Sequence, residues 1–417
     1  MEEPRPRWIQ VALGLLALLW LAVTLLRFAF PPAEEPGPSP QQKVESALAG
    51  KLAQAALFDV SLSPALRDRL LELSRSLLAP EETPASRAVL EAAAGEKEQA
   101  VALLGDPVLK ALRLQYETGQ PASEEELDAA LDGFFLEQAR LHARPDRKVE
   151  ERLRQEAGSV LLHLAVLGGV LGFNLLAGGA TLLSFPFWNR RLRQERSDPG
   201  APELPDAVLG LLVWTLGAQL VLAPALLTLL QGRADIARVL TVQLASYVFG
   251  LLVLVPVLRG GTWGFSRPGF RDLAAGFLGY WLCGPAVFLA TLLSGLLTGE
   301  PAASDNPLLK MVQEVTPGEL GLFVLLVALV GPAFEEFAFR GILYRSLREN
   351  LSRWAAILSS GTVFAVVHAD AGGLLPLLAL GVLFAYIYDL RGNLWSSFLS
   401  HGLWNGTTLL IMLVALS

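Results

Sequence analysis

The sequence has very little cysteine and no excess of basic charge. Its single cysteine, Cys283, lies inside an apolar run, so no disulfide can form within the chain and a buried structural thiol is expected. The formal net charge is −7, and no basic stripe is present that would neutralise nucleic-acid phosphates. We therefore expect neither a disulfide framework nor a nucleic-acid partner.

Apolar residues, by contrast, are abundant. They make up 53% of the 417 residues and recur in long runs, which is typical of an all-α polytopic membrane protein that uses the lipid bilayer as solvent. The first run, 8–30, is too long for the core of a signal peptide and is not followed by a cleavage site of small residues. We therefore predict a retained transmembrane anchor over residues 1–30.

The composition changes sharply after this first run. A proline-rich linker, PPAEEPGPSP, leads into a charged stretch rich in alanine and leucine, in which apolar residues recur three and four positions apart. This pattern predicts an extracytoplasmic helical domain over 31–158, long enough to bury a core of its own. No site motif lies in it, so it is either a domain that binds a protein partner or presents substrate, or a plain helical spacer.

Eight further spans are predicted in a transmembrane core over 159–417. Short connections that carry arginine follow alternate spans, and the positive-inside rule assigns these connections to the cytoplasm. This topology predicts a multi-pass protein of the cytoplasmic membrane with 31–158 outside the cytoplasm. The predicted spans are 159–186, 205–231, 236–258, 272–298, 318–346, 354–370, 373–390 and 393–416.

One predicted span contains three ionisable residues in the segment FEEFAFR, 334–340. An ionisable side chain at the middle of a bilayer costs about 2.5–3.5 kcal/mol on insertion scales, so these residues need a reason. Glu336 and Arg340 are four residues apart, which favours an ion pair on one helical face. Glu335 lies about 100° further around the helix and points elsewhere. The pattern indicates one braced and one available carboxylate, although a buried ion pair with a snorkelling glutamate is the plain structural alternative.

Two of the four histidines lie in later spans. In FAVVH, Phe364 precedes His368 by one helical turn, so its ring can pack against the imidazole. In HGLWN, His401 and Asn405 share a helical face. Each pair alone fits a satisfied core histidine or a hydrogen bond between helices. Together with Glu335 they indicate hydrolysis, because a carboxylate and an imidazole can activate water while a second imidazole and an amide donate to an oxyanion.

The motifs EExxxR, FxxxH and HxxxN follow one another in order within about 270–416. They resemble the motifs of the CPBP family, which contains the CAAX proteases and the bacteriocin-processing enzymes. The resemblance does not extend to the first anchor or to the helical domain. It implies an intramembrane endopeptidase that hydrolyses a membrane-associated protein or peptide, of the CAAX type or with a carboxyl-terminal sorting tail, with the motifs in 318–416.

The resemblance also implies roles for individual residues. Glu335 and His368 would activate the attacking water, while His401 and Asn405 would form the oxyanion hole around the scissile carbonyl. The residues that support this site would be Glu336, Arg340 and Phe364.

Two alternatives remain open. Glu335, His368 and His401 are also a plausible zinc-ligand set, although no HExxH helix is present and Asn405 suits an oxyanion donor better than a metal ligand. We favour a glutamate-dependent mechanism without a cofactor, with zinc as the runner-up. The other alternative is a non-proteolytic membrane scaffold, an immunity protein or a proton-coupled transporter. In a transporter we would expect an internal repeat of interrupted spans, and none is apparent in this sequence.

The spacing of the motifs also raises a problem of depth. Counted at about 1.5 Å per residue, Glu335 and His368 lie at different depths if each span crosses the bilayer simply. For the two residues to meet, the segment 339–351 must stay partly inside the bundle and line a water-filled cavity. The sequence leaves open from which side this cavity is reached.

Overall fold

The structure is a computed structural model that describes residues 17, 19–20, 40–59, 61–78, 83–106, 109–194, 200–231, 235–259, 261–298, 307–368 and 373–416. Throughout these ranges the regular structure is helical and no strand occurs, which confirms the all-α class. The chain forms two compact units, one made of 34–171 with 411–417 and the other of 1–33 with 172–410. The predicted anchor over 1–30 lies outside the described residues except at 17, 19 and 20, and the predicted boundaries at 31 and 158 stay predictions.

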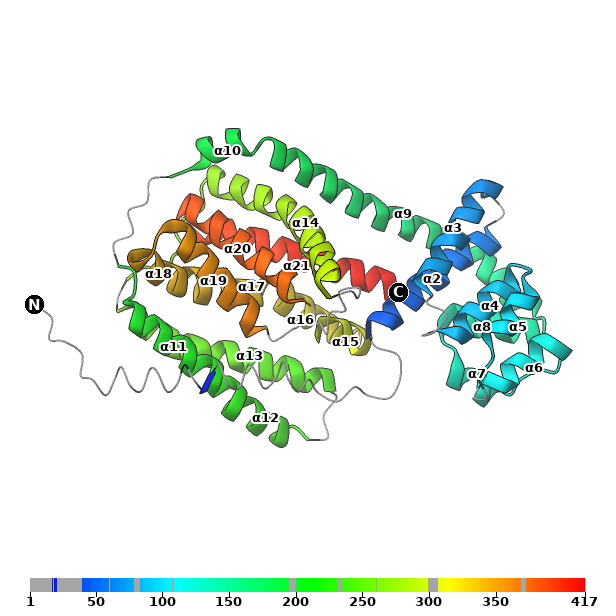
Figure 1. Cartoon of the computed structure of the whole chain (residues 1–417). Helices are drawn as coiled ribbons and strands as arrows, with labels where there is room; N and C mark the ends of the chain where they lie inside the picture. The colour runs from blue at the N-terminus through cyan, green and yellow to red at the C-terminus, as the bar shows by residue number, and fades with distance from the viewer. Residues whose placement is uncertain are drawn as a thin grey trace, which may run out of the picture. The chain divides into compact units, whose positions relative to one another are not determined.

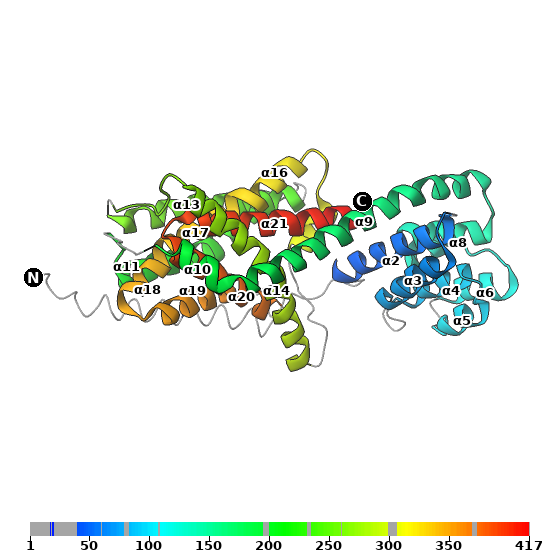
Figure 2. The same cartoon turned by 90° about the horizontal axis from the view of Figure 1, so that it is seen from above.

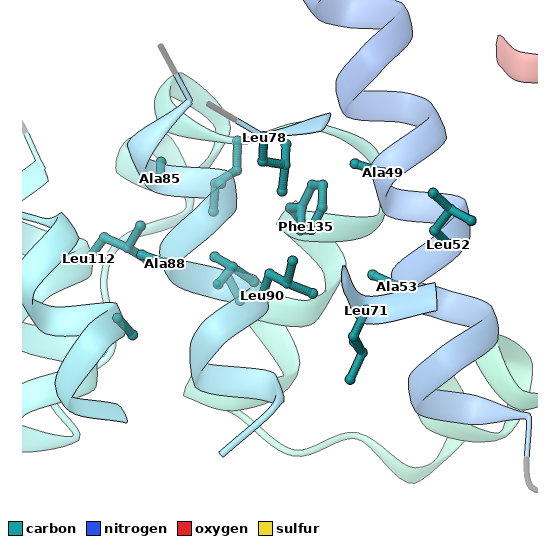
Figure 3. Packing of buried hydrophobic residues seen from close by; sticks show 14 of the residues in the cluster. Ala49, Leu52, Ala53, Leu71, Leu78, Ala85, Ala88, Leu90, Leu112 and Phe135 are labelled. Atoms are coloured by element: carbon teal, nitrogen blue, oxygen red, sulfur yellow. The ribbon is translucent and has the colours of Figure 1, made fainter. Parts of the chain in front are cut away.

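The unit around residues 34–171 is a bundle of short helices (Figure 1). Its helices are α2 (Pro40–Phe58), α3 (Pro64–Leu77), α4 (Pro84–Ala93), α5 (Lys97–Leu103), α6 (Lys110–Thr118), α7 (Glu124–Ala130) and α8 (Gly133–Ala143), followed by the first part of α9 (Arg147–Leu183). Their apolar faces meet in one core in which Leu78, Leu90 and Phe135 are almost fully buried (Figure 3). Helix α7 begins with a capping box between Ser123 and Glu126.

One carboxylate of this unit is buried and held by two arginines. The Glu91 side chain is only 2% exposed, and its oxygens lie 2.8 Å from Nη2 of Arg75 and 2.7 Å from Nε of Arg87. Burial raises the pKa of Glu91, but the hydrogen bonds and charges of both arginines lower it by more, so its pKa lies below its usual range. The ionised form of Glu91 therefore stabilises the packing of α3 against α4.

The other unit holds residues 172–410 of the predicted transmembrane core (Figures 1 and 2). After the end of α9 it contains α10 (Phe185–Leu192), α11 (Leu204–Gly217), η2 (Ala218–Leu222), α12 (Ala223–Leu229), α13 (Asp235–Leu254), η3 (Pro256–Leu258), α14 (Phe270–Thr298), α15 (Pro307–Glu314), α16 (Leu320–Leu325), η4 (Leu326–Val330), α17 (Gly331–Glu336), η5 (Phe337–Tyr344), α18 (Arg345–Asn350), α19 (Arg353–Val367), α20 (Leu374–Arg391) and α21 (Leu394–Leu416).

Six helical segments in the described part of the chain are long and apolar enough to cross a membrane, namely Arg147–Leu183, Leu204–Leu229, Ile236–Leu258, Phe270–Leu297, Leu320–Asn350 and Leu374–Arg391. Each overlaps a predicted span. The last predicted span is the helix α21, whereas the predicted span 354–370 is the shorter apolar helix α19, with 15 residues. At about 1.5 Å per residue α19 covers less than the roughly 30 Å of a hydrocarbon core. It is therefore too short to cross on its own.

Helix α20 packs against both α14 and α19 at the centre of this core. Its approach to α19 depends on facing glycines, because a Cβ on Gly381 would lie 2.8 Å from the carbonyl oxygen of Gly361, and one on Gly361 would lie 2.8 Å from the backbone nitrogen of Val382. No other residue type permits so close a contact between the two backbones. The same contact brings the carbonyl of Gly381 next to the polar residues of the site.

Proline interrupts the helical segment that carries the EExxxR motif. Pro332 cannot donate to the carbonyl of Ala328, and its ring would clash with that carbonyl in a regular α-helix. The preceding residues instead form the π-helical turn η4, in which the Gly331 N–H donates to Leu326. Backbone carbonyls of this turn thereby become available to a neighbouring helix.

Candidate active site

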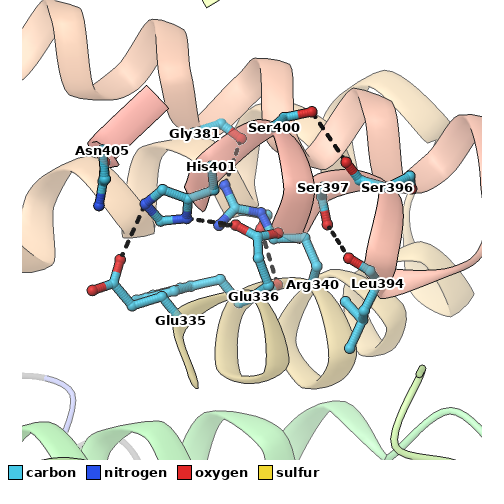
Figure 4. Close-up of polar contacts among 12 residues, drawn as sticks. Glu335, Glu336, Arg340, Gly381, Leu394, Ser396, Ser397, Ser400, His401 and Asn405 are labelled. Atoms are coloured by element: carbon cyan, nitrogen blue, oxygen red, sulfur yellow. Dashed lines mark hydrogen bonds and ion pairs between the residues drawn. The ribbon is translucent and has the colours of Figure 1, made fainter. Parts of the chain in front are cut away.

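The buried ion pair predicted from helical spacing is present. Arg340 Nη1 donates to Glu336 Oε1 at 3.0 Å, and both side chains are 0% exposed. Arg340 Nη2 donates to the carbonyl oxygen of Gly381 at 2.9 Å, and its guanidinium lies 4.7 Å from the ring centroid of Phe364. The pair thus joins the EExxxR helix to α19 and α20, and Figure 4 shows it beside the imidazole of His401.

The imidazole of His401 is fixed by a carboxylate and an aromatic ring. Its Nδ1 lies 3.0 Å from Glu336 Oε1, and its ring stacks on Phe384 at 4.5 Å between centroids. Because Glu336 is ionised by its pairing with Arg340, its oxygen accepts and Nδ1 of His401 carries the hydrogen. The other nitrogen, Nε2, faces Glu335 Oε2 at 3.7 Å.

The amide of Asn405, one turn further along α21, is also positioned by the π-helical turn. Asn405 Nδ2 donates to the carbonyl of Val327 at 3.2 Å. A Cβ on Gly402 would lie 2.7 Å from the carbonyl of Ala328, so only glycine allows α21 to approach this closely. One hydrogen of the amide is used by Val327, and the second can be donated to a ligand in the adjacent cavity.

Glu335 points away from the buried pair, as its position on the helix predicts. Its side chain is 18% exposed, and its Oε1 lies 3.5 Å from the hydroxyl of Tyr247 on α13. The ring of Tyr247 packs on Phe334 at 4.9 Å between centroids. One oxygen of Glu335 therefore lies at the outer limit of hydrogen-bond distance from the Tyr247 hydroxyl on α13, and the other faces the two histidines.

His368 approaches the same oxygen from the end of α19. Its Nδ1 lies 2.7 Å from the carbonyl oxygen of Phe364, which can only accept, so Nδ1 carries the hydrogen. The ring of Phe364 lies 4.6 Å from the imidazole, as the spacing predicts. Nε2 of His368 lies 3.9 Å from Glu335 Oε2, a separation too long for a direct hydrogen bond and suited to a bridging water.

Three hydrogen-bond acceptors thus converge. When both imidazoles are neutral, Nε2 of His368, Nε2 of His401 and Oε2 of Glu335 face one another with lone pairs and no hydrogen between them. Such an arrangement is repulsive unless a donor lies between the acceptors or one imidazole takes up a proton. A water molecule supplies two hydrogens, and an imidazolium supplies one.

Two cavities meet at this point. The larger has a volume of about 460 Å³ and is lined by Tyr247, Glu335, His368, His401 and Asn405 among mainly apolar neighbours. The smaller, of about 310 Å³, lies towards α11 and shares Tyr247, Glu335 and His368. A site of this size and apolar lining suits a segment of apolar polypeptide.

A metal ion at this site would need several closely spaced donor atoms. Within the described ranges no group of three or more His, Cys, Asp or Glu side chains is arranged so that it could hold one. Tetrahedral zinc ligands about 2.0–2.2 Å from the ion lie roughly 3.3–3.6 Å from one another, so the 3.7 and 3.9 Å contacts to Glu335 exceed that spacing by a few tenths of an ångström.

All four residues predicted to be catalytic therefore line one cavity. Of the three predicted to support them, Phe364 lines the same cavity, and Glu336 and Arg340 form the buried pair next to His401. Sequence reasoning missed Tyr247, Phe384 and Gly381. Tyr247 precedes the motifs by two spans, and a tyrosine inside an apolar run gives no local signal. Gly381 contributes only a backbone carbonyl, which no side-chain pattern reveals.

Comparisons with known proteins agree with the motifs. Residues 317–407 match the family model described as type II CAAX prenyl endopeptidase Rce1-like. The "Putative membrane peptidase YdiL" of Bacillus subtilis (strain 168) is 27% identical over 177 residues, which cover 40% of this chain and 70% of that protein. No solved structure matches the chain. The predicted resemblance to the CPBP family is thus confirmed, with the Rce1-like model matching the part of the chain that carries the three motifs.

Proposed function

We propose that this protein is an intramembrane endopeptidase that hydrolyses a peptide bond of a membrane-associated protein with water activated by Glu335 and His368. The observation that carries the proposal is the convergence of Glu335 Oε2 and the two histidine Nε2 atoms in the lining of one mainly apolar cavity. Membrane peptidase activity at the level of the family supports the same reaction class.

The first step uses the two acceptors that face a bridging water. The water donates one hydrogen to Glu335 Oε2 and the other to His368 Nε2, and its oxygen attacks the carbonyl carbon of the substrate. Glu335 takes the proton as the new C–O bond forms. The proton then passes to the departing amine nitrogen as the C–N bond breaks, so the site returns to its starting state. Tyr247 holds the second oxygen of Glu335 and so keeps Oε2 directed at the water.

The oxyanion requires donors, which Asn405 and His401 supply. The second amide hydrogen of Asn405 is available without any change of protonation. His401 is different, because its Nδ1 hydrogen is already given to Glu336, so Nε2 donates only when the ring is an imidazolium. Glu336 Oε1 lies 3.0 Å from Nδ1 of His401 and Glu335 Oε2 lies 3.7 Å from its Nε2, so each ring nitrogen faces a carboxylate oxygen that can accept a hydrogen. The protonated form of His401 is thus the one that stabilises the oxyanion.

Zinc chemistry is the competing mechanism, and a chelator distinguishes the two. We expect the purified protein to keep its cleavage rate after dialysis against a strong chelator, because no step above uses a metal. A loss of cleavage that zinc restores would replace this mechanism with the one in which Glu335, His368 and His401 are ligands.

The decisive experiment compares carboxyl termini of membrane proteins. Cells that express the intact chain are compared with cells that express Glu335→Gln, which keeps the shape of the side chain but cannot act as a base. We expect a set of membrane proteins to lose a terminal segment only with the intact chain. An Asp206→Asn variant, altered at the ion pair with Arg259 and not at a residue that lines the cavities, serves as the matched control and should behave like the intact chain. Identical termini in all three samples would favour the scaffold or transporter alternative.

A further inference from the structure

The two cavities lie on one side of the catalytic residues within the core. Residues that line the larger cavity come from the early part of α13, at 239–247, and from the later part of α14, at 287 and 291. They come from the first turns of α20, at 376–380. The connections that carry several arginines or lie beside them are 189–196, 259–271, 344–353 and 389–393. Of these, 259–271 adjoins the end of α13 and the start of α14, and 389–393 adjoins the end of α20, whereas the connection before α13 carries the single arginine Arg233. The cavity therefore extends from Glu335 away from the arginine-bearing end.

The smaller cavity extends in the same direction. It is lined by Trp214, Gln219 and Ala223, in the later part of the segment that begins at Leu204 beside the arginine-bearing end. Helix α15, which contributes Leu308 and Met311 to the larger cavity, lies at the end of the core opposite α18 in Figure 1. Both cavities are therefore on the side of α15.

The space between Glu335 and the arginine-bearing end is filled instead. Every residue from Glu336 to Ser346 is buried, and Arg345 is 0% exposed. The segment 339–351 thus stays partly inside the bundle, as predicted from the depth of the motifs. The prediction that this segment also lines the cavity is wrong for these two cavities, because Phe339 is its only residue in their linings. This helix closes one end of the core.

Hydrogen bonds fasten the connecting loops over the same end. Arg345 Nη1 donates to the carbonyl of Thr262 at 2.7 Å and its Nη2 to that of Gly200 at 3.2 Å. Arg391 Nε donates to Asp272 at 2.8 Å, which joins α20 to the start of α14. Buried arginines whose donors are satisfied by loop carbonyls hold those loops in place, because losing such a bond leaves a charge unsatisfied. We call this end of the core, formed by the buried residues 336–346 and the loops that Arg345 and Arg391 hold, the arginine-bearing cap.

We propose that substrate reaches the site from the end of the core opposite the arginine-bearing cap, which the positive-inside rule makes the extracytoplasmic end. This proposal rests on the proposed function, and it places the cleaved bond in an apolar polypeptide segment presented at the extracytoplasmic face, such as the membrane-embedded tail of an exported protein. A carboxyl terminus that stays in the cytoplasm would meet the cap and not the cavity. The side from which the cavity is reached therefore determines which class of polypeptide segment can be a substrate.

The test measures accessibility and needs no substrate. Cys283 is fully buried and is the only cysteine, so Cys283→Ala gives a background for single cysteines. Gln243→Cys places a thiol on the exposed position of α13 that lines both cavities. Ser266→Cys places one on the exposed loop at the arginine-bearing end and is the matched control. A small, permanently charged methanethiosulfonate reagent is added to intact cells and to inverted vesicles, and labelling after denaturation gives the total.

We expect Gln243→Cys to be labelled from outside in intact cells and only at background in inverted vesicles, with the reverse for Ser266→Cys. Labelling of both thiols from the same face overturns the proposal, and so does failure to label Gln243→Cys from either face while its thiol reacts after denaturation. Labelling from opposite faces with the two sides exchanged retains the route of entry but overturns the extracytoplasmic substrate.

The proteolytic proposal is tested separately. Adding Glu335→Gln to the Gln243→Cys variant should leave the labelling unchanged, because accessibility does not depend on catalysis. If the accessibility result holds and no carboxyl termini differ between cells, the route of entry stands while the peptidase function fails. If termini differ but map to cytoplasmic segments, the peptidase function stands and the inferred substrate class fails.

Discussion

The buried pair Glu336–Arg340 offers the sharpest test of the energetics of the site. Glu336→Gln removes the charge of Glu336 and leaves the guanidinium of Arg340, which is 0% exposed, without its ionic partner. Breaking a buried ion pair by removing one partner costs about 3–5 kcal/mol, because an uncompensated charge stays buried. Arg340 keeps its bond to Gly381 and its cation–π contact with Phe364 at 4.7 Å. We therefore expect Glu336→Gln to lower the free energy of unfolding by about 3 kcal/mol, near the lower end of this range.

A double-mutant cycle separates the ion pair from the loss of either side chain. Arg340→Met leaves the carboxylate of Glu336 buried and should also be strongly destabilising, whereas the double variant Glu336→Gln/Arg340→Met leaves no unpaired charge. We expect the double variant to recover about 2 kcal/mol or more relative to the sum of the single variants. Activity should be lost in all three variants, because His401 loses its carboxylate or the helix loses its link to α20.

The assay is unfolding of the purified chain in detergent micelles by increasing dodecyl sulfate, followed by tryptophan fluorescence. All nine tryptophans lie outside residues 34–171, so the signal reports on the core. Asp206→Asn, in an exposed pair, is the control and should cost less than about 1 kcal/mol. Strict additivity in the cycle, or a Glu336→Gln variant as stable as the control, would refute the reasoning.

Three further outcomes are expected. Tyr247→Phe should lower kcat for an identified substrate by roughly tenfold with little change in KM, because Glu335 is mispositioned and binding is not altered; an equal change in KM would contradict this role. Gly402→Ala should push α21 away from Ala328. Because a displacement of about 1 Å in an active site can cost about 100-fold in rate, we expect cleavage to fall by up to that factor. A fully active variant would show that the close approach of the two helices is not needed. Folding lowers the pKa of Glu91, so ionised Glu91 stabilises the folded chain. This effect is fully present above the pKa that Glu91 has in the unfolded chain, and it is lost as the pH falls through the pKa that Glu91 has in the folded chain. Hydrogen exchange in residues 84–93 should therefore be slower in the intact chain than in Glu91→Gln near neutral pH. This difference should disappear as the pH falls through the pKa of Glu91 in the folded chain, and a difference independent of pH would contradict the assignment.

Much of the site follows from sequence because its logic is local to single helices. The spacing of Glu336 and Arg340 predicts their ion pair, and the spacing of Phe364 and His368 predicts their ring contact, since residues four apart share a helical face. Long apolar runs likewise predict six of the spans, because a bilayer of fixed thickness demands them. The count of eight full crossings does not follow, since α19 is shorter than a bilayer.

What the sequence by itself determined is the helical class, the polar motifs and their pairing within each helix, because those depend on helical periodicity alone. Only the tertiary structure decided which atoms face Glu335, that Tyr247 holds it from α13, and on which side of it the cavities lie. These features arise where separate helices meet, through glycines that admit close contact and carbonyls released by a proline. Contacts between helices far apart in the chain depend on packing geometry, which periodicity along one helix does not encode.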